Sequence, residues 1–210
     1  MNLETGKYLG GIGAILLVIG FLGFIGTGYS GILGLVGLVL VLIAMKGLSD
    51  YYNEAGIFNN TLYGFATSII AVVAFVGVIV ATLLGTIADM GITDWTNTAE
   101  WTAAFQENLS DMSALLDFVG GIILAFVVLF ILLVIAAFFY RKSLNLLSSK
   151  SGVGMFSTAG LLLIIGAILT IILIGLIIIW IAIILLAVAF FSIRSPTTQP
   201  TPSTSPPPPE

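Results

Sequence analysis

The chain has 210 residues, of which 59% are hydrophobic and 8% are charged, and its formal net charge is −4. Soluble domains carry about 25% charged residues, so this chain lacks the polar surface that a water-soluble fold needs. Cysteine and histidine are absent, which excludes disulfides, thiol chemistry and the side chain best suited to proton transfer near neutral pH. The weak and dispersed charge gives no reason to expect a nucleic-acid partner.

Four long runs contain no charged residue, at 8–45, 62–88, 118–140 and 155–193. A membrane helix needs about 20 apolar residues to cross a hydrocarbon core of about 30 Å. The second and third runs each fit one crossing, whereas the first and last are long enough for two. We therefore predict an all-α fold, a polytopic transmembrane helical bundle with six spans at about 8–25, 31–46, 62–87, 118–140, 156–174 and 176–193.

The start of the chain and the breaks in the two long runs need separate interpretation. The lead-in to residue 8 is not strongly basic, which favours an uncleaved first helix over a signal peptide. The stretch "GTGYSG", residues 26–31, is rich in glycine and hydroxyl residues and predicts a turn in the first run. The last run offers only Gly175 near its midpoint. A single steeply tilted helix there, giving five crossings in all, is the alternative.

All seven prolines lie from Ser195 onward, in "SPTTQPTPSTSPPPPE". A segment of this composition cannot bury an apolar core. We therefore predict a disordered Pro/Ser/Thr-rich tail at 195–210, which follows a membrane domain at 1–194.

The orientation follows from the basic residues, because loops on the cytoplasmic side carry an excess of Lys and Arg. With six spans, every base falls on the side of the N-terminus: Lys7, Lys46, Arg141, Lys142, Lys150 and Arg194. We expect a multi-pass protein of the cell membrane with both termini cytoplasmic. Tyrosines and tryptophans, which favour membrane boundaries, support this assignment: Tyr8, Tyr51, Tyr52, Tyr63 and Tyr140 at inner boundaries, and Tyr29, Trp95, Trp101 and Trp180 at outer ones.

Residues 88–117 form the one sizeable loop on the other side, which we predict to be extracellular and acidic. This loop contains six of the ten acids and no base. Apolar residues recur in it at helical spacing, at Trp101, Phe105, Leu109, Met112 and Leu116. Asn97 and Glu100 resemble a capping arrangement. We expect one amphipathic external helix that rests its apolar stripe on the bundle or the lipid boundary and runs into the fourth span.

The two predicted cytoplasmic segments each continue a helix beyond the membrane and then meet a glycine, Gly56 or Gly152. Glycine is a natural helix stop, so we expect a helix to end at each of these positions.

In the first span, four glycines share one helix face: Gly6, Gly10, Gly13 and Gly20. Glycine lets helix backbones approach closely in lipid. We expect these residues to pack helices together, and glycine-rich helix faces of this kind could also contact a protein partner or form a homo-oligomer. The other expected partner is the lipid bilayer itself.

We identify no catalytic, cofactor-binding or metal-ligating residue. The external acids Asp89, Asp94 and Glu100 are spaced irregularly, so a solvated acidic face is favoured over a cation site. Thr82 and Thr86 could share a helix face and line a polar path, but hydroxyls in a span more often bond the carbonyl of the preceding turn. Asn108 begins a glycosylation sequon, and whether it is modified stays open.

Several stretches carry a resemblance to a known family: "LGGIGAILL" at 9–17, "KGLSDYY" and "GIFNNTLYG" within 46–64, "AGLLLIIGAIL" at 159–169 and "WIAIILLAVAFFSIR" at 180–194. They resemble an uncharacterised family of archaeal and bacterial integral membrane proteins, the domain-of-unknown-function family number 996. The resemblance implies a multi-helix membrane protein and supplies no reaction, cofactor or catalytic residue.

The sequence thus predicts a membrane protein that is not an enzyme, most simply a structural or interaction subunit. No Asp, Glu, Lys or Arg lies well inside a predicted span, although ion-coupled transporters usually need an ionisable group there. The alternative is a channel or facilitator for a small neutral or weakly polar solute.

Overall fold

The structure, a computed structural model, describes residues 2–23 and 30–194. These residues form helices and no strand, which confirms the all-α prediction. In chain order the elements are α1 (Leu3–Gly23), α2 (Ser30–Tyr51), α3 (Ala55–Asp89), α4 (Thr98–Ser110), α5 (Met112–Ser151), α6 (Met155–Leu169), the 3₁₀ turn η1 (Thr170–Ile172) and α7 (Ile174–Phe191). Within the described chain, six helices are long and apolar enough to cross a membrane, with η1 completing α6.

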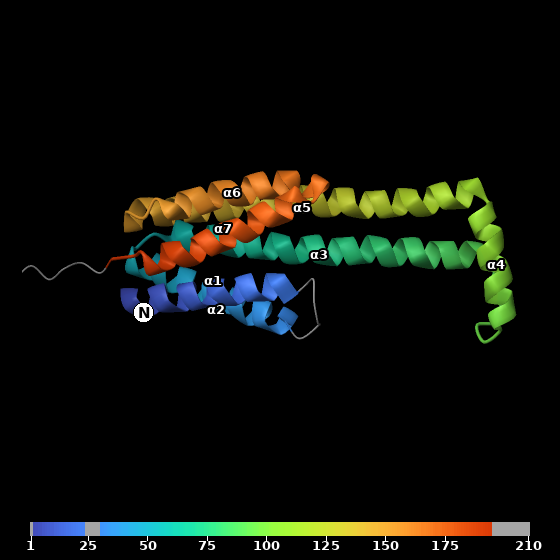
Figure 1. Ribbon diagram of the computed structural model, residues 1–210, viewed down its shortest axis with the longest axis horizontal. Helices are drawn as coiled ribbons and strands as arrows, with labels where there is room; N and C mark the ends of the chain where they lie inside the picture. The colour runs from blue at the N-terminus through green and yellow to red at the C-terminus, as the bar shows by residue number, and fades with distance from the viewer. Residues whose placement is uncertain (1, 24–29, 195–210) are drawn as a thin grey trace, which may run out of the picture.

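The six apolar helices form three antiparallel pairs, α1 with α2, α3 with α5, and α6 with α7 (Figure 1). The start of α1, the α2–α3 turn, the α5–α6 turn and the end of α7 lie together at one end of the molecule. We call this the basic end, because Lys7, Lys46, Lys150 and Arg194 lie there. The opposite end is the α4 end, where α4 lies across the tips of α3 and α5.

Glycines lie where the helices of a pair come closest. A methyl group built on Gly13 of α1 would lie 2.7 Å from the carbonyl oxygen of Gly37 in α2, and the reverse distance is 2.6 Å. Gly166 of α6 and Gly175 of α7 approach each other in the same manner. The packing role predicted for Gly13 is therefore confirmed, and it joins the first two helices.

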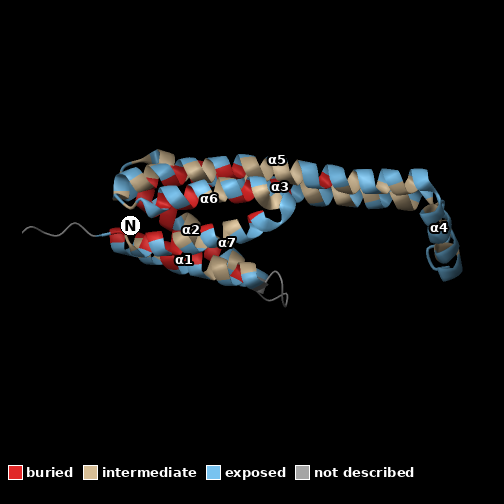
Figure 2. Ribbon diagram, turned by 45° about the horizontal axis from the view of Figure 1, so that its top comes forward, coloured by how far each residue is buried: buried red, intermediate tan, exposed pale blue. Residues whose placement is uncertain are grey.

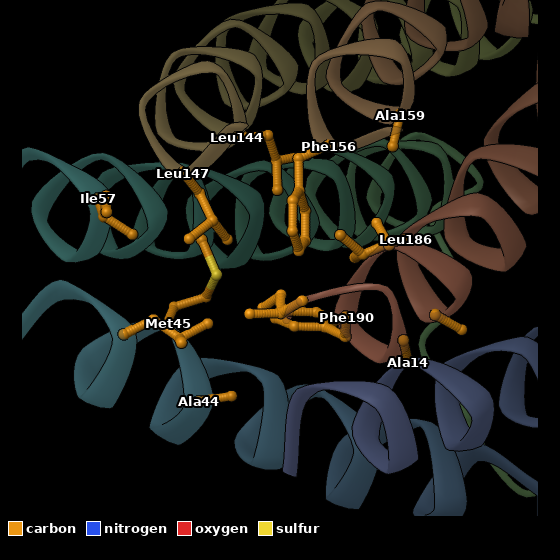
Figure 3. Close-up of a cluster of buried hydrophobic side chains, with 14 of the residues drawn as sticks. Ala14, Ala44, Met45, Ile57, Leu144, Leu147, Phe156, Ala159, Leu186 and Phe190 are labelled. Atoms are coloured by element: carbon orange, nitrogen blue, oxygen red, sulfur yellow. The ribbon is translucent and has the colours of Figure 1, made fainter. Parts of the chain in front are cut away.

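The hydrophobic core lies at the basic end, where all three helix pairs meet (Figure 3). The rings of Phe156 from α6 and Phe190 from α7 are both fully buried and pack edge to face, with their centroids 5.2 Å apart. Leu48, Ile57 and Leu147 are fully buried beside them. These side chains connect five helices, so the basic end is the part of the bundle where the pairs are locked to one another.

The three pairs differ in length. α3 has 35 residues and α5 has 40, whereas α7 has 18. At about 1.5 Å per residue, α3 and α5 reach about 52 and 60 Å, and α7 reaches about 27 Å. The α1–α2 and α6–α7 pairs consequently end well short of the α4 end, and α3 and α5 continue as a two-helix extension (Figures 1 and 2).

The predicted external helix exists as α4, but its relation to the bundle is different from the prediction. Asn97 caps α4 by accepting hydrogen bonds from the backbone N–H groups of Ala99 and Glu100. The helix then stops at Asp111, whose side chain caps α5 instead, so Met112 and Leu116 belong to α5. None of the described residues of α4 is buried. The part of the apolar stripe that lies on α4 therefore does not rest on the bundle, and its contact with the lipid boundary stays a prediction.

The break in the last apolar run differs slightly from the prediction. The backbone turns at Leu173, which has a positive φ of 61°, two residues before the predicted Gly175. Gly175 instead lies in the first turn of α7, where it contacts Gly166. Two helices flank the turn, so the alternative of one tilted helix is wrong. The predicted turn at 26–31 lies outside the described residues except for the start of α2, and so does the predicted tail at 195–210.

The two predicted helix stops at glycine had different outcomes. Gly152 ends α5 in the left-handed conformation, with a φ of 73°, as expected. Gly56 does not end α2, because α2 already ends at Tyr51 and Gly56 lies in the first turn of α3. Asn53 takes the left-handed conformation there, with a φ of 49°. Asparagine tolerates this region better than most residues.

We expect Gly13→Leu to lower the thermal stability of the protein in detergent, because the new side chain would clash with the backbone of Gly37. Overpacking of this kind costs about 1–3 kcal/mol. The matched control is Gly120→Leu, since a methyl group at Gly120 meets no described atom within 4 Å. Equal unfolding temperatures for the two variants would contradict the close approach of α1 and α2.

Candidate functional site

The carboxylates of the α3–α4 connection take part in local hydrogen bonds. Asp94 Oδ1 accepts from the hydroxyl and the backbone N–H of Thr96, and Glu100 Oε1 accepts from the backbone N–H of Thr93 at 2.7 Å. The bonds from Thr96 favour the ionised form and lower the pKa of Asp94. In the described residues, no three Asp, Glu, His or Cys side chains gather closely enough to hold a metal ion. The acids therefore shape the α3–α4 connection.

The hydroxyls considered as a polar path are bonded within their own helix. Thr82 Oγ1 donates to the carbonyl oxygen of Val78 at 2.9 Å, and Thr86 Oγ1 donates to that of Thr82 at 3.0 Å. The Thr82 side chain also lies directly against Gly121 of α5. Both hydroxyls thus bond to the carbonyl of the preceding turn, as the sequence favoured, and Thr82 also lies at the contact between α3 and α5.

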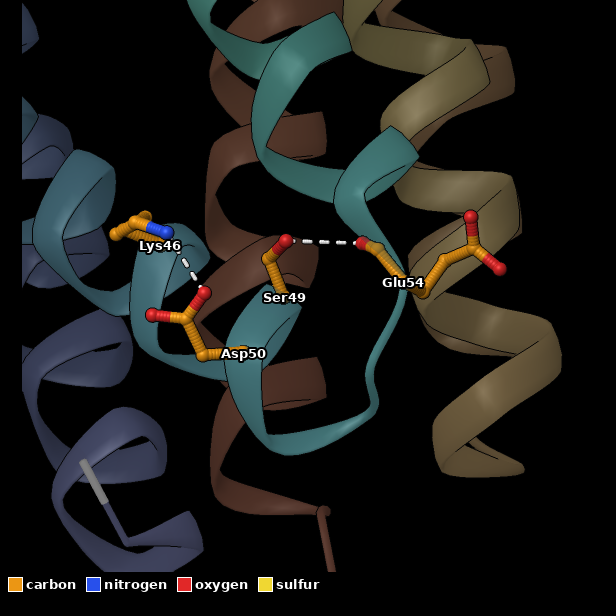
Figure 4. A network of polar contacts seen from close by, with 4 residues as sticks. All are labelled: Lys46, Ser49, Asp50 and Glu54. Carbon is orange, nitrogen blue, oxygen red and sulfur yellow. Dashed lines mark hydrogen bonds and ion pairs between the residues drawn. The ribbon is translucent and has the colours of Figure 1, made fainter.

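The most polar site of the bundle lies at the basic end, where α2 turns into α3. A pocket of about 210 Å³ opens there, and its lining is mostly polar: Lys46, Ser49, Asp50, Asn53, Glu54, Ala55, Phe58 and Asn59. All of these residues come from one stretch of chain that leaves α2, makes the turn and enters α3. Figure 4 shows the polar contacts that hold this stretch in place.

The turn is closed by two reciprocal hydrogen bonds between Ser49 and Glu54 (Figure 4). The Ser49 hydroxyl donates to the carbonyl oxygen of Glu54, and the Glu54 backbone N–H donates to the carbonyl oxygen of Ser49, both at 2.9 Å. Ser49 is only 3% exposed, so its hydroxyl needs this partner. The residue that sets the turn is therefore a buried serine at the end of α2.

Two ion pairs flank this turn. Lys46 and Asp50, four residues apart on α2, are joined at 2.6 Å, and Lys150 of α5 reaches Glu54 at 3.2 Å. The first pair is more than half exposed, so it adds little stability. The second pair has the greater structural consequence, because it ties the end of α5 to the α2–α3 turn.

Beneath the turn, a buried hydroxyl pair connects α3 to α5. The hydroxyl oxygens of Thr61 and Ser143 lie 2.7 Å apart, and both lie within hydrogen-bond distance of the carbonyl oxygen of Ile57, at 2.9 and 2.6 Å. The two side chains are 3% and 0% exposed. The two hydroxyl protons are thus shared among three short contacts. The pair fixes the register of the two long helices.

The basic residues also join helices at this end. Lys7 of α1 donates to the carbonyl oxygen of Ile193, just beyond α7, at 2.9 Å. Lys46 lies 5.5 Å from the ring centroid of Phe58 in α3. Next to the pocket, burial and the neighbouring Tyr51 raise the pKa of Tyr52, so this phenol stays neutral. The basic end is thus a layer of cations and hydroxyls beneath the apolar core.

Comparison with known proteins gives one family. The model of a family described as "protein of unknown function (DUF996)" matches residues 33–184. The uncharacterized protein MJ1644 of Methanocaldococcus jannaschii is 35% identical over 196 residues, which cover 92% of this chain and 94% of that protein. The chain belongs to the DUF996 family. No solved structure matches it.

The region that matches the DUF996 family begins within α2 and ends within α7. It therefore contains the α2–α3 turn, its pocket, the Thr61–Ser143 pair and both long helices. The family is one of unknown function, so the match supplies no reaction for these residues.

Sequence reasoning did not identify this site. The spacing of Lys46 and Asp50 is the four-residue spacing of a helical ion pair, which a closer reading of the sequence would have shown. The Lys150–Glu54 and Thr61–Ser143 contacts join residues that are 96 and 82 positions apart. No local pattern indicates such contacts, because they depend on how α3 and α5 pack.

We expect Ser143→Ala to destabilise the protein by about 1 kcal/mol, the usual net contribution of a buried hydrogen bond. Ser143 is fully buried and bonds to Ile57 and Thr61. The matched control is Ser110→Ala, whose hydroxyl bonds only to its own helix at an exposed site. Thermal unfolding in detergent measures both variants, and an unchanged midpoint for Ser143→Ala would show that the buried pair does not stabilise the α3–α5 contact.

Proposed function

We propose that this DUF996 protein is a non-enzymatic interaction subunit that self-associates in the membrane through the outer half of α3. The observation that carries the proposal is the uncovered two-helix extension at the α4 end. α3, which is described throughout, has no buried residue after Ala71. Half of a long membrane helix is thus left with a single neighbour, α5.

One face of this half of α3 carries only small residues, at Gly77, Ala81, Gly85 and Ala88. All four are exposed. Their spacing of four, four and three residues places them on one side of the helix. Small residues at this spacing let two membrane helices approach closely.

The glycines of this face differ from the glycines that pack helices together elsewhere in the spans. Gly13, Gly64 and Gly166 are each covered by a neighbouring helix of the same chain. By contrast, a methyl group built on Gly77 or Gly85 would meet no described atom within 4 Å. Where glycine is used for packing inside this bundle, another helix lies against it. A second copy of the chain is the partner that supplies the same kind of helix at the same depth.

The test is disulfide cross-linking in the membrane, which the cysteine-free chain permits. We expect full-length Ala81→Cys to form a covalent dimer on mild oxidation, because a symmetric contact brings two copies of this face together. The matched control is Val76→Cys, at a side chain that is 51% exposed but lies about 140° around the helix. Adding Gly85→Leu to Ala81→Cys should reduce the dimer several-fold.

Equal cross-linking of the Ala81→Cys and Val76→Cys variants would indicate random collision and would overturn self-association through this face. If the Ala81→Cys variant stays monomeric and co-purifies with one other membrane protein, the interaction role stands. The partner is then that protein and not a second copy of the chain.

We further propose that the basic end faces the cytoplasm and that α4 lies outside the cell. Support comes from the gathering of Lys7, Lys46 and Lys150 at one end of the bundle, because cytoplasmic flanks are rich in Lys and Arg. Between α3 and α5, the described segment 90–111 has no Lys or Arg.

Side-specific labelling tests this orientation in intact cells. A membrane-impermeant maleimide should label Thr93→Cys directly, and it should label Thr198→Cys only after the membrane is permeabilised. The reverse pattern would place α4 in the cytoplasm, and labelling of both variants in intact cells would contradict an odd number of crossings between the two positions.

A further inference from the structure

Near the basic end α6 contacts α5, and this contact allows the heights that the two helices reach to be compared. The backbone of α6 at Gly160 lies directly against Arg141 of α5, since a methyl group on Gly160 would be 3.1 Å from the Arg141 Cα atom. Arg141 also marks where the charge-free run of α5 begins. The contact therefore places Gly160 of α6 at the height where the charge-free run of α5 begins.

From this level the two helices rise by different amounts. The charge-free run of α5 continues to Asp117, 24 residues away, which corresponds to about 36 Å. α6 with η1 continues for only 12 residues to Ile172, which corresponds to about 18 Å. A hydrocarbon core of about 30 Å that begins at this level is spanned by α5 but not by the part of α6 above Gly160. Figure 1 shows the same difference, because the α6–α7 turn lies well short of the α4 end.

The tip of the α6–α7 pair has the composition of a membrane interior. Its side chains are apolar and far from buried by the protein, with Ile171 69% and Leu173 70% exposed. The turns that lie at the basic end are different, since the α2–α3 turn contains Asp50, Asn53 and Glu54. Apolar side chains held at a headgroup layer would lose the stabilisation that burial in hydrocarbon gives them. The tip is therefore suited to acyl chains.

The turn also satisfies polar groups that lipid would leave without partners. The Leu173 backbone N–H donates to the carbonyl oxygen of Thr170 at 3.0 Å, and the Leu176 N–H donates to that of Leu173 at 3.1 Å. The one hydroxyl near the tip, on Thr170, donates to the carbonyl oxygen of Gly166 at 2.9 Å. Internal bonding of this kind reduces the cost of a chain reversal inside lipid.

The aromatic residue nearest to the tip is consistent with this depth. Trp180 lies about two turns below Leu173 on α7, and its indole N–H donates to the carbonyl oxygen of Val18 in α1 at 3.4 Å. At a membrane boundary the indole N–H would bond to water or headgroups. Here the donor is directed into the bundle, where the protein supplies the acceptor.

We infer that the α6–α7 pair is a re-entrant hairpin that enters from the basic end, turns at Leu173 inside the hydrocarbon layer and returns to the same side. Acyl chains of the α4-side leaflet cover its tip. The inference is independent of self-association through α3, because α6 and α7 take no part in that face.

The test compares spin-label depth at two positions of equal height in full-length protein reconstituted into phosphatidylcholine vesicles. Ile171→Cys lies at the tip, about 16 Å above Gly160, and Ile131→Cys lies on α5 about 15 Å above Arg141. Both sites are exposed to lipid, at 69% and 51%. A third label at Leu124→Cys, 55% exposed, reports whether the outer part of α5 is also in lipid. Ser149→Cys at the basic end supplies the aqueous reference.

We expect the labels at Ile171 and Ile131 to show the same depth near the middle of the bilayer, with high contact with oxygen and low contact with a water-soluble nickel chelate. The label at Leu124 should also lie within lipid. The inference would be overturned if the label at Ile171 lay at headgroup depth while the label at Ile131 lay deep in the bilayer. The lipid leaflet would then bend inward to meet the tip. A Leu124 label in water would overturn it as well, because α3 and α5 would then stand out of a bilayer that ends at the tip.

Discussion

Lipid removes the hydrophobic attraction that joins helices in water, and this bundle depends on close backbone contact instead. Gly13 and Gly37 bring α1 against α2, and Gly166 and Gly175 bring α6 against α7. At each of these places an added methyl group would meet backbone atoms within 3.0 Å. These two pairs are thus joined at contacts that only glycine allows.

The two ends of the bundle are packed differently, and their contacts differ accordingly. At the basic end, the buried rings of Phe156 and Phe190 lock the pairs together, and the hydroxyls of Thr61 and Ser143 hold α3 in register with α5. Toward the α4 end only α3 and α5 continue. One part of the molecule is therefore a packed six-helix body, and the other is an apolar two-helix extension whose surface is available to lipid or to a second copy.

The distribution of charge matches this division. Lysines join helix ends at the basic end, where Lys7 bonds to the end of α7 and Lys150 pairs with Glu54. The acids of the α4 end serve as caps and turn residues, as Asp111 does at the start of α5. The ionised groups lie toward the two ends, where water can solvate them. The apolar layer between the ends contains hydroxyls that bond within their own helices.

The sequence by itself determined the all-α class, the number of apolar helices and the separation of bases from acids, because a run of apolar residues long enough for lipid is a local property. Caps such as Asn97 and stops such as Gly152 were local as well. The tertiary structure alone decided that α3 and α5 outreach their neighbours, that Leu173 and Asn53 are the turning points, and that Ser143 meets Thr61. The reason is physical: apolar composition sets where a chain can lie in a membrane, but only the packing of one helix on another sets its register, its height and the contacts it makes.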